Sequence, residues 1–140
     1  MTMSEQQFFN VEPEVAGGLA EGTVIDRSSH PPVVSKVHYR VEGWLGDGLI
    51  ESFPVFLLRK EAWNAIASEG LTGARIDNAE ISVAPDLSEV ALPVFVWFRP
   101  TGIEGTDDFG TAPDGRLVMS QRARNVLAEF GLAHAEITPV

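Results

Sequence analysis

The stretch that decides the fold occurs twice, as LLRKEAWNAIASEGLTGARI at residues 57–76 and as VMSQRARNVLAEFGLAHAEI at residues 118–137. Each copy shows the pattern of a strand, a short helix, Gly-Leu and a second strand. Placed over each other at an offset of 61 positions, the copies share seven identical residue pairs: Ala62/Ala123, Asn64/Asn125, Ala67/Ala128, Gly70/Gly131, Leu71/Leu132, Ala74/Ala135 and Ile76/Ile137. This predicts an internal repeat, and convergence on one amphipathic pattern is the alternative.

Two helices are predicted, near residues 60–69 and 120–130. The first has an apolar face and is followed by Gly70, which suits a left-handed C-terminal cap. Ser120 is expected to cap the second helix at its start, and Gly131 to end it. The continuous apolar stripe of the second helix is predicted to lie in the core, where replacement of its phenylalanine by alanine would cost about 3–5 kcal/mol. The stripe consists of Val126, Leu127 and Phe130.

The remaining pattern predicts an α+β fold, with a mixed, mainly antiparallel sheet. Strands are expected near 36–43, 49–58, 73–83, 92–99, 116–119 and 134–138. At 140 residues the chain is expected to form a single domain over 1–140. Residues 1–35 are expected to be an irregular N-terminal segment packed on the sheet, with Phe8–Val15 as a candidate first strand.

Local signals refine these strands. Gly46-Asp47-Gly48 predicts a tight reversal, so that 36–43 and 49–58 would form a hairpin. Pro54 interrupts the second of these strands and is expected at an edge or a bulge, because proline donates no ladder hydrogen bond. The nearly continuous apolar run near 92–99 predicts a central strand that is covered on both faces.

Composition and charge narrow the classes of function. Twenty acidic residues against ten basic ones give a net charge of −10, which disfavours nucleic acids and anionic membranes as partners. We expect a cytoplasmic protein, because the start lacks the features of a signal peptide and the chain has no cysteine. The oligomeric state is expected to be a monomer or a homodimer, the latter through an exposed strand edge.

Catalytic, metal and cofactor sites are not predicted. The three histidines His30, His38 and His134 stand in no metal-binding spacing. Ser28-Ser29-His30 is too tight a run to form a triad, and no glycine-rich segment matches a phosphate loop. The protein is therefore expected to act by binding a protein partner and not by catalysis.

A partner-binding surface is predicted around exposed acids and one tryptophan. The stretch from Asp77 to Asp114 carries eight acids against the single base Arg99, and its central loop is rich in glycine. Trp44 lies at a strand end, where an indole often contacts a partner. The predicted contact residues are Trp44, Asp47, Glu104, Asp107, Asp108 and Asp114.

A family resemblance gives this surface a role. The phrases Val118–Ala123, Val126-Leu127, Phe130–Leu132 and Glu136-Ile137 resemble the closing motif of immunity proteins that accompany bacterial polymorphic toxins. Leu57-Leu58, Gly70–Gly73 and Asp107–Gly110 are similar to other segments of that group, and the resemblance covers mainly residues 50–140. It implies a non-enzymatic protein that occludes the active site of a cognate toxin. The acidity of the chain favours a basic toxin domain as the partner, and many toxins of this kind are nucleases.

A competing interpretation is a small ligand-binding domain or enzyme. It would use a cleft formed by Asp26, His30, His38 and the Asp107-Asp108 loop. A pocket of roughly 300 Å³ or more that is lined by several of these groups would favour this interpretation.

Overall fold

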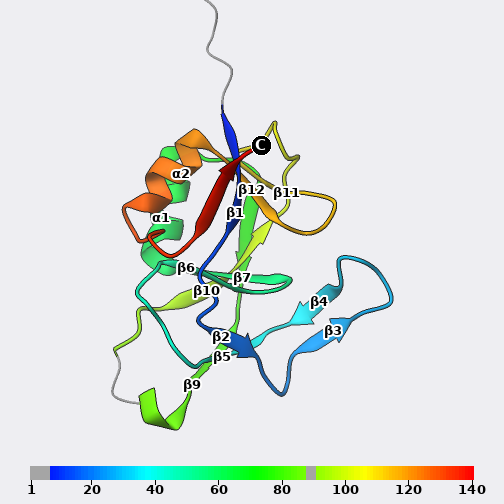
Figure 1. Cartoon of the computed structure of the whole chain (residues 1–140), viewed down its shortest axis with the longest axis vertical. Coiled ribbons are helices and arrows are strands. Elements are labelled where there is room, and N and C mark those ends of the chain that lie inside the picture. The colour runs from blue at the N-terminus through cyan, green and yellow to red at the C-terminus, as the bar shows by residue number, and fades with distance from the viewer. Residues whose placement is uncertain (1–6, 88–90) are drawn as a thin grey trace, which may run out of the picture.

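The computed structural model describes residues 7–87 and 91–140 and has an α+β fold with mostly antiparallel sheets (Figure 1). Two four-stranded sheets and two helices form most of the molecule. The first sheet has the order β11 (Phe109–Thr111), β12 (Leu117–Ser120), β1 (Phe8–Glu12) and β13 (Glu136–Pro139). The second has the order β6 (Leu49–Ser52), β7 (Val55–Arg59), β10 (Phe95–Pro100) and β8 (Ala74–Asp77).

Two smaller sheets complete the fold. The third sheet consists of β2 (Gly17–Leu19), β5 (His38–Val41) and β9 (Glu80–Val83), with β5 antiparallel to β2 and parallel to β9. In the fourth, β3 (Val24–Asp26) and β4 (Val33–Lys36) form an antiparallel arm beside the body of the molecule (Figure 1). A short 3-10 helix, Pro85–Leu87, follows β9, and no helix of the described ranges is long and apolar enough to cross a membrane.

Both predicted helices are confirmed, as α1 (Lys60–Glu69) and α2 (Gln121–Ala128). Gly70 has a φ of 68° at the end of α1, the left-handed conformation that glycine adopts without a steric penalty. The Ser120 side chain accepts a hydrogen bond from the Ala123 N–H, which satisfies an otherwise unpaired donor at the start of α2. Gly70 and Ser120 thus cap these two ends as predicted. The expected end of the second helix at Gly131 is wrong, because α2 ends at Ala128 with Glu129 as its C-cap.

The two strand–helix–strand units are also confirmed, and their surroundings correspond. β6, β7, α1 and β8 follow one another in the first copy, as β11, β12, α2 and β13 do in the second. In each sheet one strand from outside the unit lies between the two strands that flank the helix, antiparallel to both. This strand is β10 in the second sheet and β1 in the first. The origin of the correspondence by duplication stays a prediction.

The core consists of two clusters on opposite faces of the second sheet. One cluster joins both large sheets to α1 and α2, which pack against each other, and contains Phe98 and Leu127. The other lies between the second and third sheets and contains Phe95, Trp97 and Tyr39. β10 is thus central and covered on both faces, as its apolar run predicts.

Three predicted strands differ from the structure. The expected hairpin of 36–43 with 49–58 is wrong, because β5 pairs within the third sheet while β6 pairs with β7. The reversal lies instead at Phe53-Pro54, where Ser52 is opposite Val55 and the proline needs no ladder partner. The strand expected over 73–83 is two strands, since β8 pairs with β10 and β9 with β5. Alternation alone carries no sign of such a change of sheet.

The N-terminal segment is more regular than expected. Residues 1–35 were predicted as irregular, whereas β1 is an inner strand of the first sheet with β12 and β13 as neighbours. Phe9 and Val11 are buried there, because their side chains point to the core face of the strand. The candidate strand at Phe8–Val15 is therefore present over Phe8–Glu12.

The helix stripe predicts an order of mutational effects. Leu127 is fully buried, whereas Val126 and Phe130 are partly buried at the edge of the same cluster. Leu127→Ala is expected to lower the free energy of unfolding by about 2–5 kcal/mol, because it leaves a cavity in the core. Phe130→Ala is expected to cost less, and urea denaturation of both variants measures the order. A larger loss for Phe130→Ala would contradict the packing described here.

Candidate functional site

Asp47, one of the predicted contact residues, is buried in the fold. Its side chain is 2% exposed and accepts hydrogen bonds from the main-chain N–H of His134 at 2.8 Å and from His134 Nδ1 at 3.1 Å. Asp47 precedes β6 of the first copy, and His134 follows Gly131-Leu132 of the second. The predicted partner contact is therefore wrong, because the carboxylate is already paired inside the protein.

Asp108 is buried in the same manner. It is 7% exposed, and its Oδ2 accepts from the Thr72 N–H at 2.9 Å while its Oδ1 accepts from Ser120 Oγ at 2.7 Å. Asp108 precedes β11 of the second copy, and Thr72 follows Gly70-Leu71 of the first. Its predicted partner contact is wrong for the same reason.

These two aspartates are equivalent positions of the repeat, since 61 residues separate them. Each reaches from the start of one copy's hairpin to the loop after the other copy's helix. The adjoining main chain repeats the contact, with Gly48 N–H donating to the Gly131 carbonyl at 3.0 Å and Phe109 N–H donating to the Thr72 carbonyl at 3.1 Å. We name these paired contacts, Asp47 on His134 and Asp108 on Thr72, the carboxylate clasp. The alignment of the copies, carried ten residues further toward the N-terminus, would have indicated it.

Glu14 extends the clasp on the Asp47 side. Its carboxylate is buried and accepts from the main-chain N–H groups of Leu45 and Asp47. Ligand atoms of Glu14, Asp47 and His134 lie within 4.8 Å of one another, a grouping that sequence spacing could not show. Because each carboxylate already accepts N–H donors of the chain, a cation would have to displace those bonds, and the cluster is best explained as structural.

The other predicted acids remain near the surface. Glu104 is exposed, and Asp107 is half-buried with Oδ2 accepting from the Ile103 N–H at 2.8 Å. Asp114 is exposed and bonded to Arg116, whose main-chain N–H, as the largest cause, lowers the pKa of the Asp114 carboxyl. These three positions therefore stay available as contact residues.

Trp44 is half-buried and held from two sides. Its indole N–H donates to the Asp47 carbonyl at 2.8 Å, and its ring packs edge-on against Phe95. The ring thus helps to fix the Trp44–Gly48 segment, which leads from the third sheet into the second. Its partial exposure still permits the predicted partner contact.

The residues of the alternative cleft have separate local roles. Asp26 accepts hydrogen bonds from the Ser28 hydroxyl and, as the smaller cause, from the Ser28 N–H, and these bonds lower the pKa of its carboxyl. The ring nitrogens of His38 lie 2.6 Å from the Glu21 carbonyl and 2.7 Å from Ser82 Oγ. His30 lies beside Phe53, with ring centroids 6.3 Å apart. Asp108 belongs to the clasp. Among the described residues, none of these contacts joins one member of this set to another, so they do not bring the set together in one cleft.

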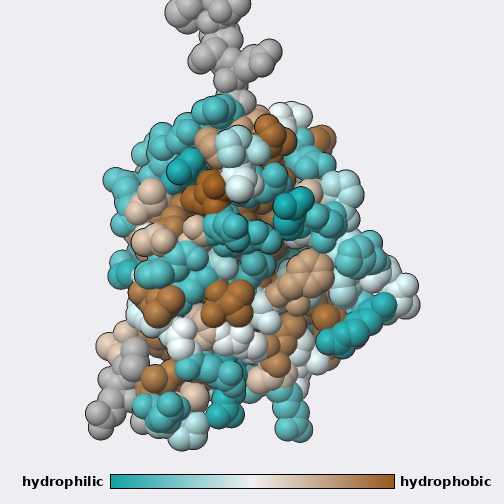
Figure 2. Space-filling model, viewed as in Figure 1, coloured by the Kyte–Doolittle hydropathy of each residue, from teal (hydrophilic) through white to brown (hydrophobic). Residues whose placement is uncertain are grey.

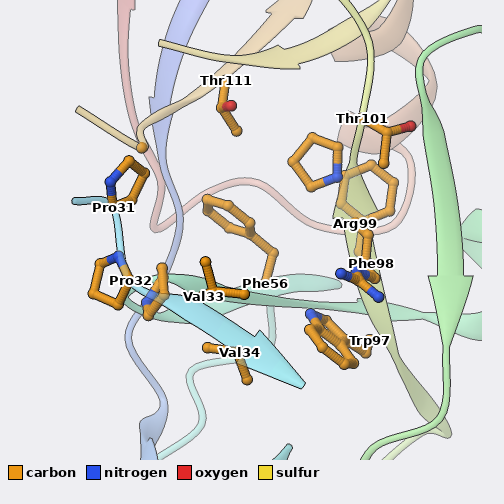
Figure 3. A pocket seen from close by; sticks show the side chains of 13 residues that line it. Pro31, Pro32, Val33, Val34, Phe56, Trp97, Phe98, Arg99, Thr101 and Thr111 are labelled. Atoms are coloured by element: carbon orange, nitrogen blue, oxygen red, sulfur yellow. The ribbon is translucent and has the colours of Figure 1, made fainter. Parts of the chain in front are cut away.

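A pocket of about 300 Å³ lies where several strands end (Figure 3). Prolines occupy these ends because they donate no ladder hydrogen bond, and Pro31, Pro32, Pro54 and Pro100 all line the pocket. The other lining residues are Val33, Val34, Phe56, Trp97, Phe98, Arg99, Thr101, Thr111 and Gly115. None of the residues named for the alternative cleft is among them.

The polar groups of the pocket include one guanidinium and one indole. Arg99 Cζ lies 4.3 Å from the centre of the Trp97 ring, and Arg99 Nη1 donates to Asp77 Oδ2 at 2.8 Å. Trp97 and Arg99 lie two residues apart on β10 and therefore share one face of the strand. The pocket thus combines apolar walls with donors held on a central strand.

Exposed apolar side chains continue from the pocket onto the surface. Phe53 is 46% exposed and lies against Gly115, where an added Cβ would come within 2.9 Å of the ring. Val33, which lines the pocket on the β3–β4 arm, is 58% exposed. Figure 2 shows that apolar and hydrophilic residues are interspersed over the viewed side of the molecule. We name the pocket together with Phe53 the apolar face.

The clasp predicts that buried and exposed aspartates differ in how much they contribute to the free energy of unfolding. Asp47→Ala and Asp108→Ala are each expected to lower the free energy of unfolding by at least about 2 kcal/mol, because buried N–H donors lose their acceptor. Asp114→Ala is the matched control on the surface and is expected to have little effect. Urea denaturation measures all three, and equal small losses would show that the clasp carries no stability.

A second prediction concerns Glu51 on β6, which is half-buried. Burial of the Glu51 carboxyl, and to a smaller extent the nearby charge of Glu12, raises the pKa of Glu51 from 4.5 to about 7. The fold therefore favours the protonated acid, so ionisation lowers stability as pH rises from about 4.5 to about 7. Glu51→Gln is expected to be more stable than the parent above this window and to lose that advantage below it. A pH-independent difference in chemical denaturation would contradict the shift.

Comparison with known proteins gives no family for the chain. No family model matches it, no curated protein matches its sequence, and no solved structure matches its fold. The comparisons therefore neither support nor oppose the immunity-protein resemblance.

Proposed function

We propose that the protein is a non-enzymatic binding protein of the immunity type, which neutralises a cognate toxin by occluding its active site. The observation that carries the proposal is the apolar face: a pocket with proline and aromatic walls beside the exposed Phe53 and Val33. Protein interfaces concentrate their binding energy where an apolar side chain enters such a pocket, with polar groups around it.

The charge of the protein supports a basic partner. Its net charge is −10, and the exposed Asp114 directly precedes Gly115, which lines the pocket. Acids at the rim of an apolar contact speed association with a basic protein and add little to the stability of the fold. A nuclease toxin fits this description, since its substrate face must be basic to hold phosphates. Glu104 and Asp107 are further candidate contacts.

Ligand binding is the second candidate, and the pocket volume is the observation that favours it. About 300 Å³ is the lower limit of sites that enclose small molecules. Asp26, His30, His38 and the Asp107-Asp108 loop, which this interpretation named, do not line the pocket. The flanking exposed side chains extend the apolar contact beyond an enclosed site, which favours a protein partner.

The test takes the product of the gene directly upstream as the toxin candidate. Phe53→Ser is expected to weaken binding at least about tenfold, because a large exposed aromatic contact beside the pocket is lost. Val94→Ser is the matched control, since Val94 is exposed but precedes β10 at the end away from Arg99 and Pro100. Both variants are first compared with the parent by thermal unfolding, and calorimetry then measures affinity.

Growth rescue gives the decisive outcome. Co-expression of the parent protein with the toxin candidate is expected to restore growth, and Phe53→Ser to restore it less well. Failure of the parent to rescue growth or to co-purify would remove the immunity function. Equal binding by Phe53→Ser and Val94→Ser would instead place the contact elsewhere on the molecule.

A further inference from the structure

The pocket contains a hydrogen-bond donor that the fold leaves unused. Trp97 is 7% exposed, and within residues 7–87 and 91–140 its indole N–H makes no hydrogen bond. Trp44, by comparison, donates its indole N–H to a carbonyl. Figure 3 shows the ring nitrogen of Trp97 on the side that faces Val33 and Val34. Every fully enclosed side-chain N or O atom of the described residues has a hydrogen-bond partner, so this N–H opens onto the pocket, where an acceptor from outside can replace solvent.

The other residues of the pocket indicate which kind of ligand would carry that acceptor. Its walls are mainly the carbon surfaces of prolines, valines and phenylalanines, which favour an apolar group. Arg99 adds a second donor, with Nη1 engaged by Asp77. The proline walls carry no N–H, so a bound chain could not extend a sheet along them. The fitting ligand therefore joins an apolar group to a neutral or weakly charged oxygen acceptor.

We propose that the pocket binds an extended segment of the partner protein, taking up one apolar side chain while a main-chain carbonyl accepts a hydrogen bond from Trp97 Nε1. This inference rests on the proposed protein-binding function and names the chemistry of its contact. About 300 Å³ accommodates one large side chain with its adjoining peptide group, and Phe53 and Val33 contact the flanking residues. Every peptide chain supplies the required carbonyl.

The test observes the indole N–H of Trp97 directly. In a ¹⁵N-labelled sample this signal is assigned by its absence from Trp97→Phe. N-acetyl-leucine methylamide is the probe, because it carries an apolar side chain between two amide carbonyls. It is expected to shift the Trp97 signal downfield and to saturate in the millimolar range. N-acetyl-glycine methylamide, which lacks the side chain, is expected to have no such effect.

Three variants separate the contribution of the Trp97 N–H to probe binding from the contribution of the pocket's apolar space. Trp97→Phe keeps an aromatic wall but removes the donor, and is expected to weaken probe binding about two- to tenfold. Trp63→Phe makes the same change outside the pocket, against Phe98, and is expected to bind normally. Thr111→Trp fills the pocket from an exposed position above Pro31 and Phe56 and is expected to abolish binding (Figure 3). It keeps the inference testable should Trp97→Phe unfold.

Several results would overturn the inference. These are no shift of the Trp97 signal, an equal response to the glycine probe, or unchanged binding by both Trp97→Phe and Thr111→Trp. A shift that grows with protein concentration alone would assign the pocket to a second copy of this chain. Because the probe needs no toxin, a positive titration with failed growth rescue would refute the immunity function alone. Growth rescue without probe binding would refute only the pocket chemistry.

Discussion

The structure depends on two buried carboxylates that join the two copies of one structural unit. Asp47 binds the loop after α2, and Asp108 binds the loop after α1. Each bond spans a large sequence separation, so each fixes the position of one copy's hairpin against the other copy's helix. A buried carboxylate is stable only when donors satisfy it, and both find main-chain N–H groups in these loops. The charged groups thus set the relative placement of the copies, while the shared apolar cluster supplies the burial.

The inner strands explain how this arrangement creates the apolar face. β10 lies between β7 and β8 of the first copy and is covered by a core cluster on each face. Where β10, β7 and β4 meet prolines, sheet pairing stops, and side chains that would otherwise be covered line the pocket. Trp97 and Arg99 are consequently held on a rigid strand and not on a loop. A binding site built on a strand keeps its geometry before the partner arrives, which lowers the entropic cost of association.

Much of the fold could be predicted from local pattern, whereas the roles of the acids could not. Periodicity and caps located both helices, and the 61-residue offset located both units. β5 pairs with β2 and β9 and not with β6, and Glu14, from a distant part of the chain, holds the Trp44–Gly48 segment that follows β5. Asp107 and Asp108 are neighbours in one glycine-rich loop, yet one remains half-buried near the surface and the other is enclosed by Thr72 and Ser120. Composition cannot separate them, because the difference arises from tertiary contacts.

Partner binding is thus assigned to the apolar face, and structural support to the carboxylate clasp. Hydrogen exchange of the protein, free and bound to the toxin candidate, tests this assignment most directly. Added protection is predicted in the segments that border the pocket, residues 31–34, 53–56 and 97–101, with unchanged exchange at the Thr72 and His134 amides that the clasp already holds. Protection confined to surfaces away from these segments would contradict the account.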